Sequence, residues 1–177
     1  MLSIERDGFF QTPPEVVRQM MDKATLMFGD RVLEPSAGLG AILHPFACTW
    51  GEPLYIVAVE KNSVRCEKLS EQFPGVEVHC ADFLTWKHSH NFTKILMNPP
   101  FEEGQDIRHI EHAYEFLAPE GTLVCIMGEG AFFREDRLAK RFRNWMDYVE
   151  GVSYKLPEGS FKSSGTDVNA RIVVVHK

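Results

Sequence analysis

The sequence has 177 residues, of which 44% are hydrophobic and 25% charged, as in a single soluble globular domain. Its four cysteines lie far apart without a Cys-x-x-Cys pair, which argues against a disulfide scaffold or zinc knuckle and predicts reduced core thiols. The net charge of −6 argues against a surface that binds nucleic acid over its whole area. With neither a secretory signal nor an apolar run of the ~18–20 residues that span a bilayer, the protein is expected in the cytoplasm, without membrane contact.

Short apolar runs alternate along the chain with segments of helical period, which predicts one α/β domain over residues 1–177 with a largely parallel sheet. Helices are expected over 15–27, 41–50, 62–73, 105–117 and 134–148. Strands are expected over 31–34, 54–59, 76–80, 94–97, 122–127, 149–156 and 170–176. Pro119 to Gly121 is predicted to be a turn. Because 157–169 contains no helical pattern, the last two strands are expected to form an antiparallel hairpin at the sheet edge.

The segment from Glu34 to Gly40 follows a predicted strand and opens a helix, where glycines allow a tight turn and close approach of a ligand. A Gly-x-Gly pair without a third glycine is a weak signal by itself. Glu60 strengthens it, because it ends the next strand 20 residues after Gly40, where nucleoside-binding folds place the acid that accepts from ribose hydroxyls. The alternative is a tight turn followed by a glutamate that caps the next helix.

The side chains around this turn favour one nucleoside over another. Ser36 stands where dinucleotide sites usually have their first glycine, and Glu34 would repel a pyrophosphate. The same acid attracts a cation, so S-adenosylmethionine, with its sulfonium and ammonium groups, suits the turn better than a nicotinamide dinucleotide. Asp82 and Phe83 follow the third strand and offer an acceptor and a ring face for adenine. Capping of a helix by Asp82 is an equal alternative.

Asn98, Pro99, Pro100 and Phe101 end a predicted buried strand and form a rigid loop, since two prolines fix two φ angles. The Asn98 side-chain oxygen and the Pro99 carbonyl can accept hydrogen bonds, and Phe101 offers a face for stacking. Two acceptors beside a ring describe a receptor for a planar molecule that bears an NH₂ group. The alternative is a strand-ending turn with a half-buried phenylalanine.

These segments, together with Phe9 to Pro13, resemble the Rossmann-like S-adenosylmethionine-dependent N6-adenine DNA methyltransferases over nearly the whole chain. The resemblance implies a doubly wound, mostly parallel sheet of seven strands with a C-terminal antiparallel hairpin, and S-adenosylmethionine as cofactor. It places the following residues in the cofactor site: Phe10, Gln11, Thr12, Glu34, Pro35, Gly38, Gly40, Glu60, Asp82, Phe83 and Asn98. It makes Asn98, Pro99, Pro100 and Phe101 the catalytic loop that holds the target base.

An adenine inside a duplex cannot reach such a loop, so the target is expected to be single-stranded or flipped out. Phe161 is a candidate to stack on that base, with packing on its own strands as the alternative. The chain leaves no room for a separate target-recognition domain. RNA adenine, a protein glutamine, or a cofactor-binding module that needs a partner subunit therefore remain alternatives to DNA.

Two clusters of charged and titratable residues have simpler interpretations than a binding site. The segment from Arg134 to Lys162 carries seven basic and five acidic residues, which suggests local contact with nucleic acid, although a solvated helix face is the more common explanation. The histidines at 88, 90, 109 and 112 are interpreted as surface or core residues, because no nearby cysteine or carboxylate completes a metal set, and no metal is expected.

Overall fold

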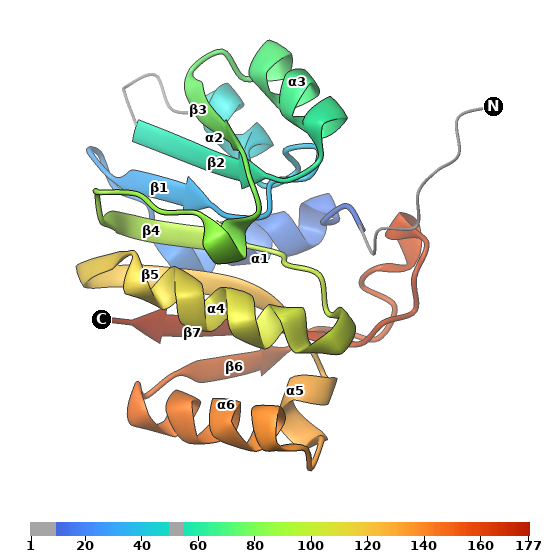
Figure 1. Cartoon of the computed structure of the whole chain (residues 1–177). Coiled ribbons are helices and arrows are strands. Elements are labelled where there is room, and N and C mark those ends of the chain that lie inside the picture. Colours follow the sequence, from blue (N-terminus) through green and yellow to red (C-terminus); the bar gives the residue numbers. More distant parts are fainter. Residues whose placement is uncertain (1–9, 50–54) are drawn as a thin grey trace.

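The computed structural model describes residues 10–49 and 55–177, and its strands form one sheet (Figure 1). The strands are β1 (Arg31–Glu34), β2 (Tyr55–Glu60), β3 (Val76–Cys80), β4 (Phe92–Met97), β5 (Leu117–Gly128), β6 (Val152–Lys155) and β7 (Ala170–His176). Their order is β3-β2-β1-β4-β5-β7-β6, with parallel pairing from β3 to β5 and β7 antiparallel to both β5 and β6. The predicted fold class and the C-terminal antiparallel hairpin are confirmed.

Helices cover both faces of the sheet. They are α1 (Pro14–Ala24), α2 (His44–Thr49), α3 (Ser63–Gln72), α4 (Gln105–Glu115), α5 (Gly130–Phe133) and α6 (Arg137–Tyr148), with 3₁₀ turns η1 (Phe83–Thr85), η2 (Glu102–Gly104) and η3 (Lys162–Ser164). In Figure 1, α4 and α6 lie in front of the sheet and α1 lies behind it. No helix among the described residues is long and apolar enough to cross a membrane.

Successive residues of the central strands point to opposite faces and so fill two separate cores. In β4, Leu96 packs with α1 and α3, whereas Ile95 and Met97 pack with α4 and α6. All three side chains are fully buried. Burial on both faces is the environment in which continuous apolar runs form parallel strands, which explains why these strands could be read from the sequence.

Three predicted helices differ from the observed ones for local reasons. The helix predicted over 134–148 begins only at Arg137, because Arg134 is extended with ψ 145° and Asp136 caps the helix by accepting from the Ala139 N–H at 3.0 Å. The first helix ends at Ala24, where Thr25 takes a left-handed conformation with φ 49°. The helix predicted over 41–50 begins at His44 after a series of turns, and position 50 lies outside the described residues.

The predicted turn at Pro119 to Gly121 lies inside β5 as a bulge. Strand β4 pairs Phe92 with Leu117 but Lys94 with Thr122, so β5 carries extra residues at the place where Glu120 has φ 61°. Strand β6 is shorter than the predicted 149–156.

Two of the cysteines behave as predicted and one does not. Cys66 and Cys125 are buried free thiols, but Cys80 at the end of β3 is exposed rather than part of the core. The side chain of Cys48 lies outside the described part of the structure.

Candidate active site

The carboxyl ends of four parallel strands bring the predicted site residues to one edge of the sheet. Glu34 ends β1, Glu60 ends β2, and Asn98 directly follows β4. The strand order reverses between β1 and β4, which makes this edge the topological switch point where open α/β sheets bind ligands. A cavity of about 340 Å³ lies here.

Ten of the predicted site residues line this cavity: Phe10, Pro35, Glu60, Asp82, Phe83, Asn98, Pro99, Pro100, Phe101 and Phe161. A smaller cavity shares Phe10, Ser36 and Asn98 with it and is also lined by Gln11, Thr12 and Glu34. Gly38 and Gly40 line neither. The predicted set is therefore brought together except for the two glycines, and Phe9 lies outside the described residues.

The two glycines support the conformation of the turn without lining either cavity. The Gly38 N–H donates to Glu60 Oε2 at 2.9 Å and so ties the turn to the end of β2. Gly40 has φ 78°, and a Cβ at this position would lie 2.4 Å from the Phe73 ring. Gly40 is thus required by its left-handed backbone and by packing against α3. The structure gives it no direct contribution to the wall of either cavity.

Glu60 is fixed by several donors before any ligand binds. Its Oε1 accepts from the Asn62 N–H at 2.9 Å and from Arg65 Nε at 3.1 Å. Arg65 lines the cavity beside it and was not recognised in the sequence. A carboxylate offers about four lone-pair positions, and the N–H groups of Gly38, Asn62 and Arg65 occupy three of them, so Glu60 keeps acceptor capacity for one ribose hydroxyl.

Glu34 is a buried acid that the protein satisfies only in part. It is 2% exposed, and its Oε2 has no hydrogen-bond partner among the described residues. Burial, followed by the nearby charge of Glu60, raises the pKa of Glu34 well above its usual range. A buried acceptor without a partner is costly, and a cationic ligand group would remove that cost.

The Asn98 side chain is held in one orientation by the N-terminal segment. Its Nδ2 donates to Thr12 Oγ1 at 3.0 Å and lies 3.4 Å from the Phe10 carbonyl oxygen. A carbonyl can only accept, so the nitrogen faces Phe10 and the Asn98 Oδ1 is left to accept from a ligand. Ser164 Oγ donates to the Gln11 carbonyl at 2.6 Å, which ties the same segment to the loop before β7.

The Phe101 ring rests against the end of β5. A Cβ added at Gly128 would lie 3.4 Å from this side chain, an ordinary van der Waals distance, so the ring lies beside the end of β5. Asp106 of α4 holds Gly128 in place, because its Oδ2 accepts from the Gly128 N–H at 3.1 Å. Burial raises the pKa of Asp106 to about 6, even though hydrogen bonds from Ile107 and Gly128 act in the opposite direction. Asp106 is a positioning residue that the sequence analysis missed.

His109 of α4 also lines the main cavity and was interpreted in the sequence only as a surface or core histidine. Its Nδ1 lies 2.8 Å from the Gln105 carbonyl oxygen, so this nitrogen carries the proton and Nε2 has the free lone pair. Burial lowers the pKa of His109, which favours the neutral ring. The available signal was its position between Ile107 and Ile110 on the buried face of an amphipathic helix.

Three residues of the cavity wall, one acidic and two aromatic, also have structural roles. Asp82 caps η1, accepting from the Leu84 N–H at 2.9 Å. Phe83 packs its ring among Trp86, His109 and other rings of the core. Phe161 is likewise almost fully buried. The alternatives of a capping Asp82 and a packed Phe161 are therefore both present in the structure.

The basic residues of α6 are largely neutralised by neighbouring acids. Lys140 lies 2.9 Å from Glu135, Arg143 lies 3.5 Å from Glu135, and Arg141 contacts Glu111 with two nitrogens. These ion pairs make α6 a solvated charged helix face, which was the more common explanation offered for this segment.

Comparisons with known proteins decide the family. A model of the methyltransferase small domain matches residues 15–157, most of the chain. The chain belongs to the methyltransferase small domain family. Among curated relatives, the Type II methyltransferase M.TthHB8I of Thermus thermophilus is 36% identical over 94 residues, covering 53% of this chain and 21% of that protein.

Solved structures share the fold of this methyltransferase domain. A modification subunit assigned to a type I restriction enzyme of Vibrio vulnificus superposes with a TM-score of 0.79 at 18% identity, covering 98% of this chain and 46% of the other. TrmN of Thermus thermophilus superposes with a TM-score of 0.72 at 20% identity, covering 98% and 51%. The chain spans about half or less of the length of these relatives.

Proposed function

We propose that this methyltransferase domain transfers the methyl group of S-adenosylmethionine to the exocyclic N6 amine of adenine in DNA. The observation that carries the proposal is the anchored amide of Asn98, whose Oδ1 is left to accept a hydrogen bond at the cavity. Pro99 and Phe101 lie in the same wall. Together they supply two acceptors and a ring for one planar amine.

The residues at the switch point fit S-adenosylmethionine. Glu34 has a buried oxygen without a partner, which suits the ammonium of the methionine portion. Glu60 retains acceptor capacity for a ribose hydroxyl, and Asp82 and Phe83 line the same cavity and would face the adenine of the cofactor. When bound, the cofactor supplies a methyl group already activated by its sulfonium.

The chain's own residues then act mainly by position and electrostatics. Asn98 Oδ1 and the Pro99 carbonyl accept the two amine hydrogens, which makes the nitrogen lone pair available and stabilises the positive charge that develops on nitrogen. The proton is released to water afterwards. Phe101, supported by Gly128, holds the base plane against the cavity wall.

The choice of DNA rests on the relatives and the choice of adenine on the loop. A Type II methyltransferase and a restriction-enzyme modification subunit are among the proteins that this chain resembles. Phenylalanine at position 101, rather than tyrosine, favours adenine by resemblance. The paired cations of α6 favour a partner that supplies target recognition.

The decisive experiment is transfer of a labelled methyl group from S-adenosylmethionine to separate pools of DNA, RNA and protein, with the modified nucleoside or residue identified by mass spectrometry. We expect N6-methyladenine in DNA. Label confined to RNA or to protein glutamine would show that the substrate is not DNA. Cofactor binding without transfer to any pool would show that the chain is a cofactor-binding module that needs a partner subunit for activity.

The matched variant is Asn98→Ala. Removal of one transition-state acceptor is expected to lower kcat about 10²-fold or more, while cofactor affinity stays within a few fold. Activity within a few fold of the unmodified chain would contradict the role given to Asn98.

A further inference from the structure

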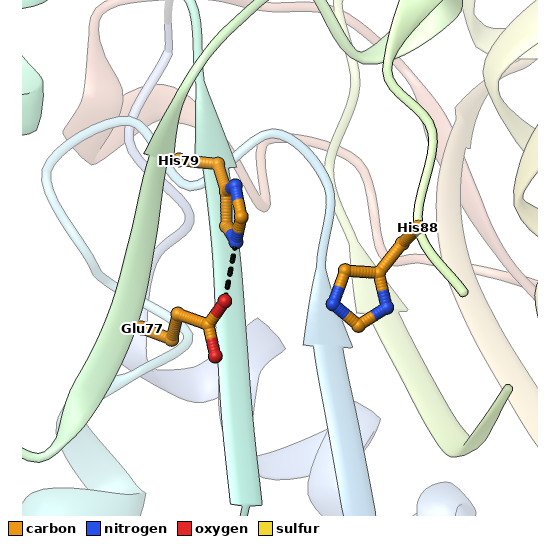
Figure 2. A group of neighbouring side chains, drawn as sticks. All are labelled: Glu77, His79 and His88. Carbon is orange, nitrogen blue, oxygen red and sulfur yellow. Dashed lines mark hydrogen bonds and ion pairs between the residues drawn. The ribbon is translucent and has the colours of Figure 1, made fainter. Parts of the chain in front are cut away.

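Three potential metal ligands meet at the edge of the sheet, outside both cavities. Glu77 and His79 are two residues apart on edge strand β3, so their side chains lie on one face, and His88 approaches from the connection between η1 and β4 (Figure 2). One ligand atom of each residue lies within 4.8 Å of the others. The expectation that no carboxylate lies near His88 was therefore wrong, because β3 supplies one across the fold.

The ligand atoms already point toward one another. His79 Nε2 lies 2.7 Å from Glu77 Oε1, and His88 turns one ring nitrogen toward the same space (Figure 2). Zinc bonds of 2.0–2.2 Å in a tetrahedral site correspond to ligand separations of about 3.3 Å. A small movement of the His88 ring would thus complete three of the four positions, with water in the fourth.

Neighbouring groups orient these ligands as outer partners do in metal sites. The Tyr55 hydroxyl of β2 donates to Glu77 Oε2 at 2.6 Å and leaves Oε1 to face His79. The Trp86 ring stacks on His88 with centroids 5.0 Å apart and planes inclined by 16°, which limits the ring's movement.

We propose that Glu77, His79 and His88 bind a divalent transition-metal ion of the zinc class. Two imidazoles and one carboxylate suit zinc, whereas magnesium and calcium prefer oxygen ligands throughout. The ion takes the place of the Nε2 proton between His79 and Glu77, and that proton moves to His79 Nδ1, which keeps the ring neutral. At His88 the proton moves to Nδ1, so the exposed 3.2 Å contact that Nδ1 accepts from the His90 N–H is given up.

The bound ion links β3 directly to the connection that follows η1. The same segment of chain carries Asp82 and Phe83, which line the cofactor cavity. The ion would therefore restrict movement of this part of the cavity wall without touching the reacting atoms. Neither the binding nor its test depends on methyl transfer.

The test uses the full chain without a histidine tag, freed of metal with a chelator and titrated with Zn²⁺ by calorimetry. Binding of one ion per chain is expected, and Co²⁺ in its place is expected to give the visible absorption of a tetrahedral site. His79→Ala and His88→Ala should each lower zinc affinity at least tenfold and abolish the cobalt bands. His44→Ala removes an exposed histidine at the start of α2 and serves as the matched control, expected to bind like the unmodified chain.

The proposal is overturned if the chain binds no zinc at about 100 μM, or if His44→Ala loses as much affinity as the two site variants. Unchanged binding by both site variants would likewise show adventitious surface binding only. All three substitutions are at exposed or half-buried positions, and circular dichroism confirms folding before titration. His88→Gln, which keeps a polar side chain of similar length, replaces His88→Ala if the alanine variant does not fold.

Discussion

The buried carboxyl group of Glu34 destabilises the ligand-free fold and offers an acceptor to a cationic ligand group. One of its oxygens is buried without a partner, and burial together with Glu60 raises its pKa. A carboxyl group whose pKa is higher in the folded than in the unfolded chain keeps its proton longer when folded. Its contribution to stability is therefore fully present below the unfolded pKa and is lost as pH rises through the folded pKa.

Glu34→Gln should separate these two effects. We expect the free energy of unfolding of the ligand-free chain to rise by about 1 kcal/mol at pH 8 and to change little at pH 4, since glutamine removes a buried charge. Affinity for S-adenosylmethionine should fall at least tenfold, because its ammonium loses an ionic partner. Urea unfolding at both pH values and calorimetry measure these quantities. The exposed Glu67→Gln is the control, and unchanged cofactor affinity in Glu34→Gln would refute the ammonium contact.

Gly40 is predicted to serve the fold rather than the ligand. Gly40→Ala places a methyl group 2.4 Å from the Phe73 ring on a backbone with φ 78°, so we expect a loss of about 2 kcal/mol or more in stability. A Cβ at Gly75 meets no atom within 4 Å, and Gly75→Ala should stay within about 0.5 kcal/mol. Urea unfolding compares the two. Equal stabilities would show that the turn relaxes and that the packing argument fails.

The contact between α4 and β5 lies beside the loop that ends in Phe101. Asp106 accepts hydrogen bonds from both Ile107 and Gly128, and a Cβ added at Gly128 would lie 3.4 Å from the Phe101 side chain. The Asp106 side chain therefore acts on Phe101 through the end of β5, without touching it.

Asp106→Ala leaves the buried Gly128 N–H without its acceptor and should lower the free energy of unfolding by about 1–3 kcal/mol. The folded pKa of Asp106 is about 6, above its usual value, so its protonation stabilises the fold at low pH and this contribution is lost between about pH 4 and pH 6. The difference between the two proteins should accordingly be larger at pH 4.5 than at pH 7.5. Guanidinium unfolding at both values measures it, and a larger difference at pH 7.5 would contradict the raised pKa.

The elements that sequence predicts well are those defined by short-range pattern. Strands β1, β3 and β7 have the predicted bounds, because apolar runs end at residues that leave the sheet. The start of α6 was predicted three residues early, at Arg134, since charged residues extend the helical pattern and only the Asp136 cap marks the observed start. The amphipathic pattern of α4 places Asp106 and His109 on its buried face, but their contacts with the end of β5 and with the cavity depend on how α4 lies against the sheet, which no local pattern specifies.

At the scale of the whole molecule, the strand order explains why the site could be predicted from residues far apart in sequence. Strand ends at Glu34, Glu60 and Asn98 meet because the parallel strands β2, β1 and β4 are neighbours. The metal-binding cluster could not be predicted in this way. This cluster forms only because β3 and the connection before β4 lie side by side. Neither segment alone shows the residue spacing of a metal site.

Charge distribution limits what this chain can do alone with DNA. The net charge is −6, and the cations Lys140, Arg141 and Arg143 have acidic partners on or beside α6. Each phosphate contact requires a cation free to replace condensed counterions, so few are available from this helix. Affinity from electrostatics should therefore be low and only weakly dependent on salt.

We expect the isolated chain to bind a random duplex with a Kd of about 10 μM or weaker at about 150 mM salt, with a shallow dependence of log Kd on log salt. Methylation of a random-sequence library should then show little preference beyond adenine itself, since the contacts proposed for Asn98, Pro99 and Phe101 recognise only the target base. Fluorescence anisotropy at several salt concentrations and sequencing of the methylated library measure the two. Glu135→Gln removes the acid that pairs with Lys140 and Arg143 and should tighten DNA binding and steepen the salt dependence. Submicromolar binding together with a single methylated sequence would instead show that this chain carries its own target recognition.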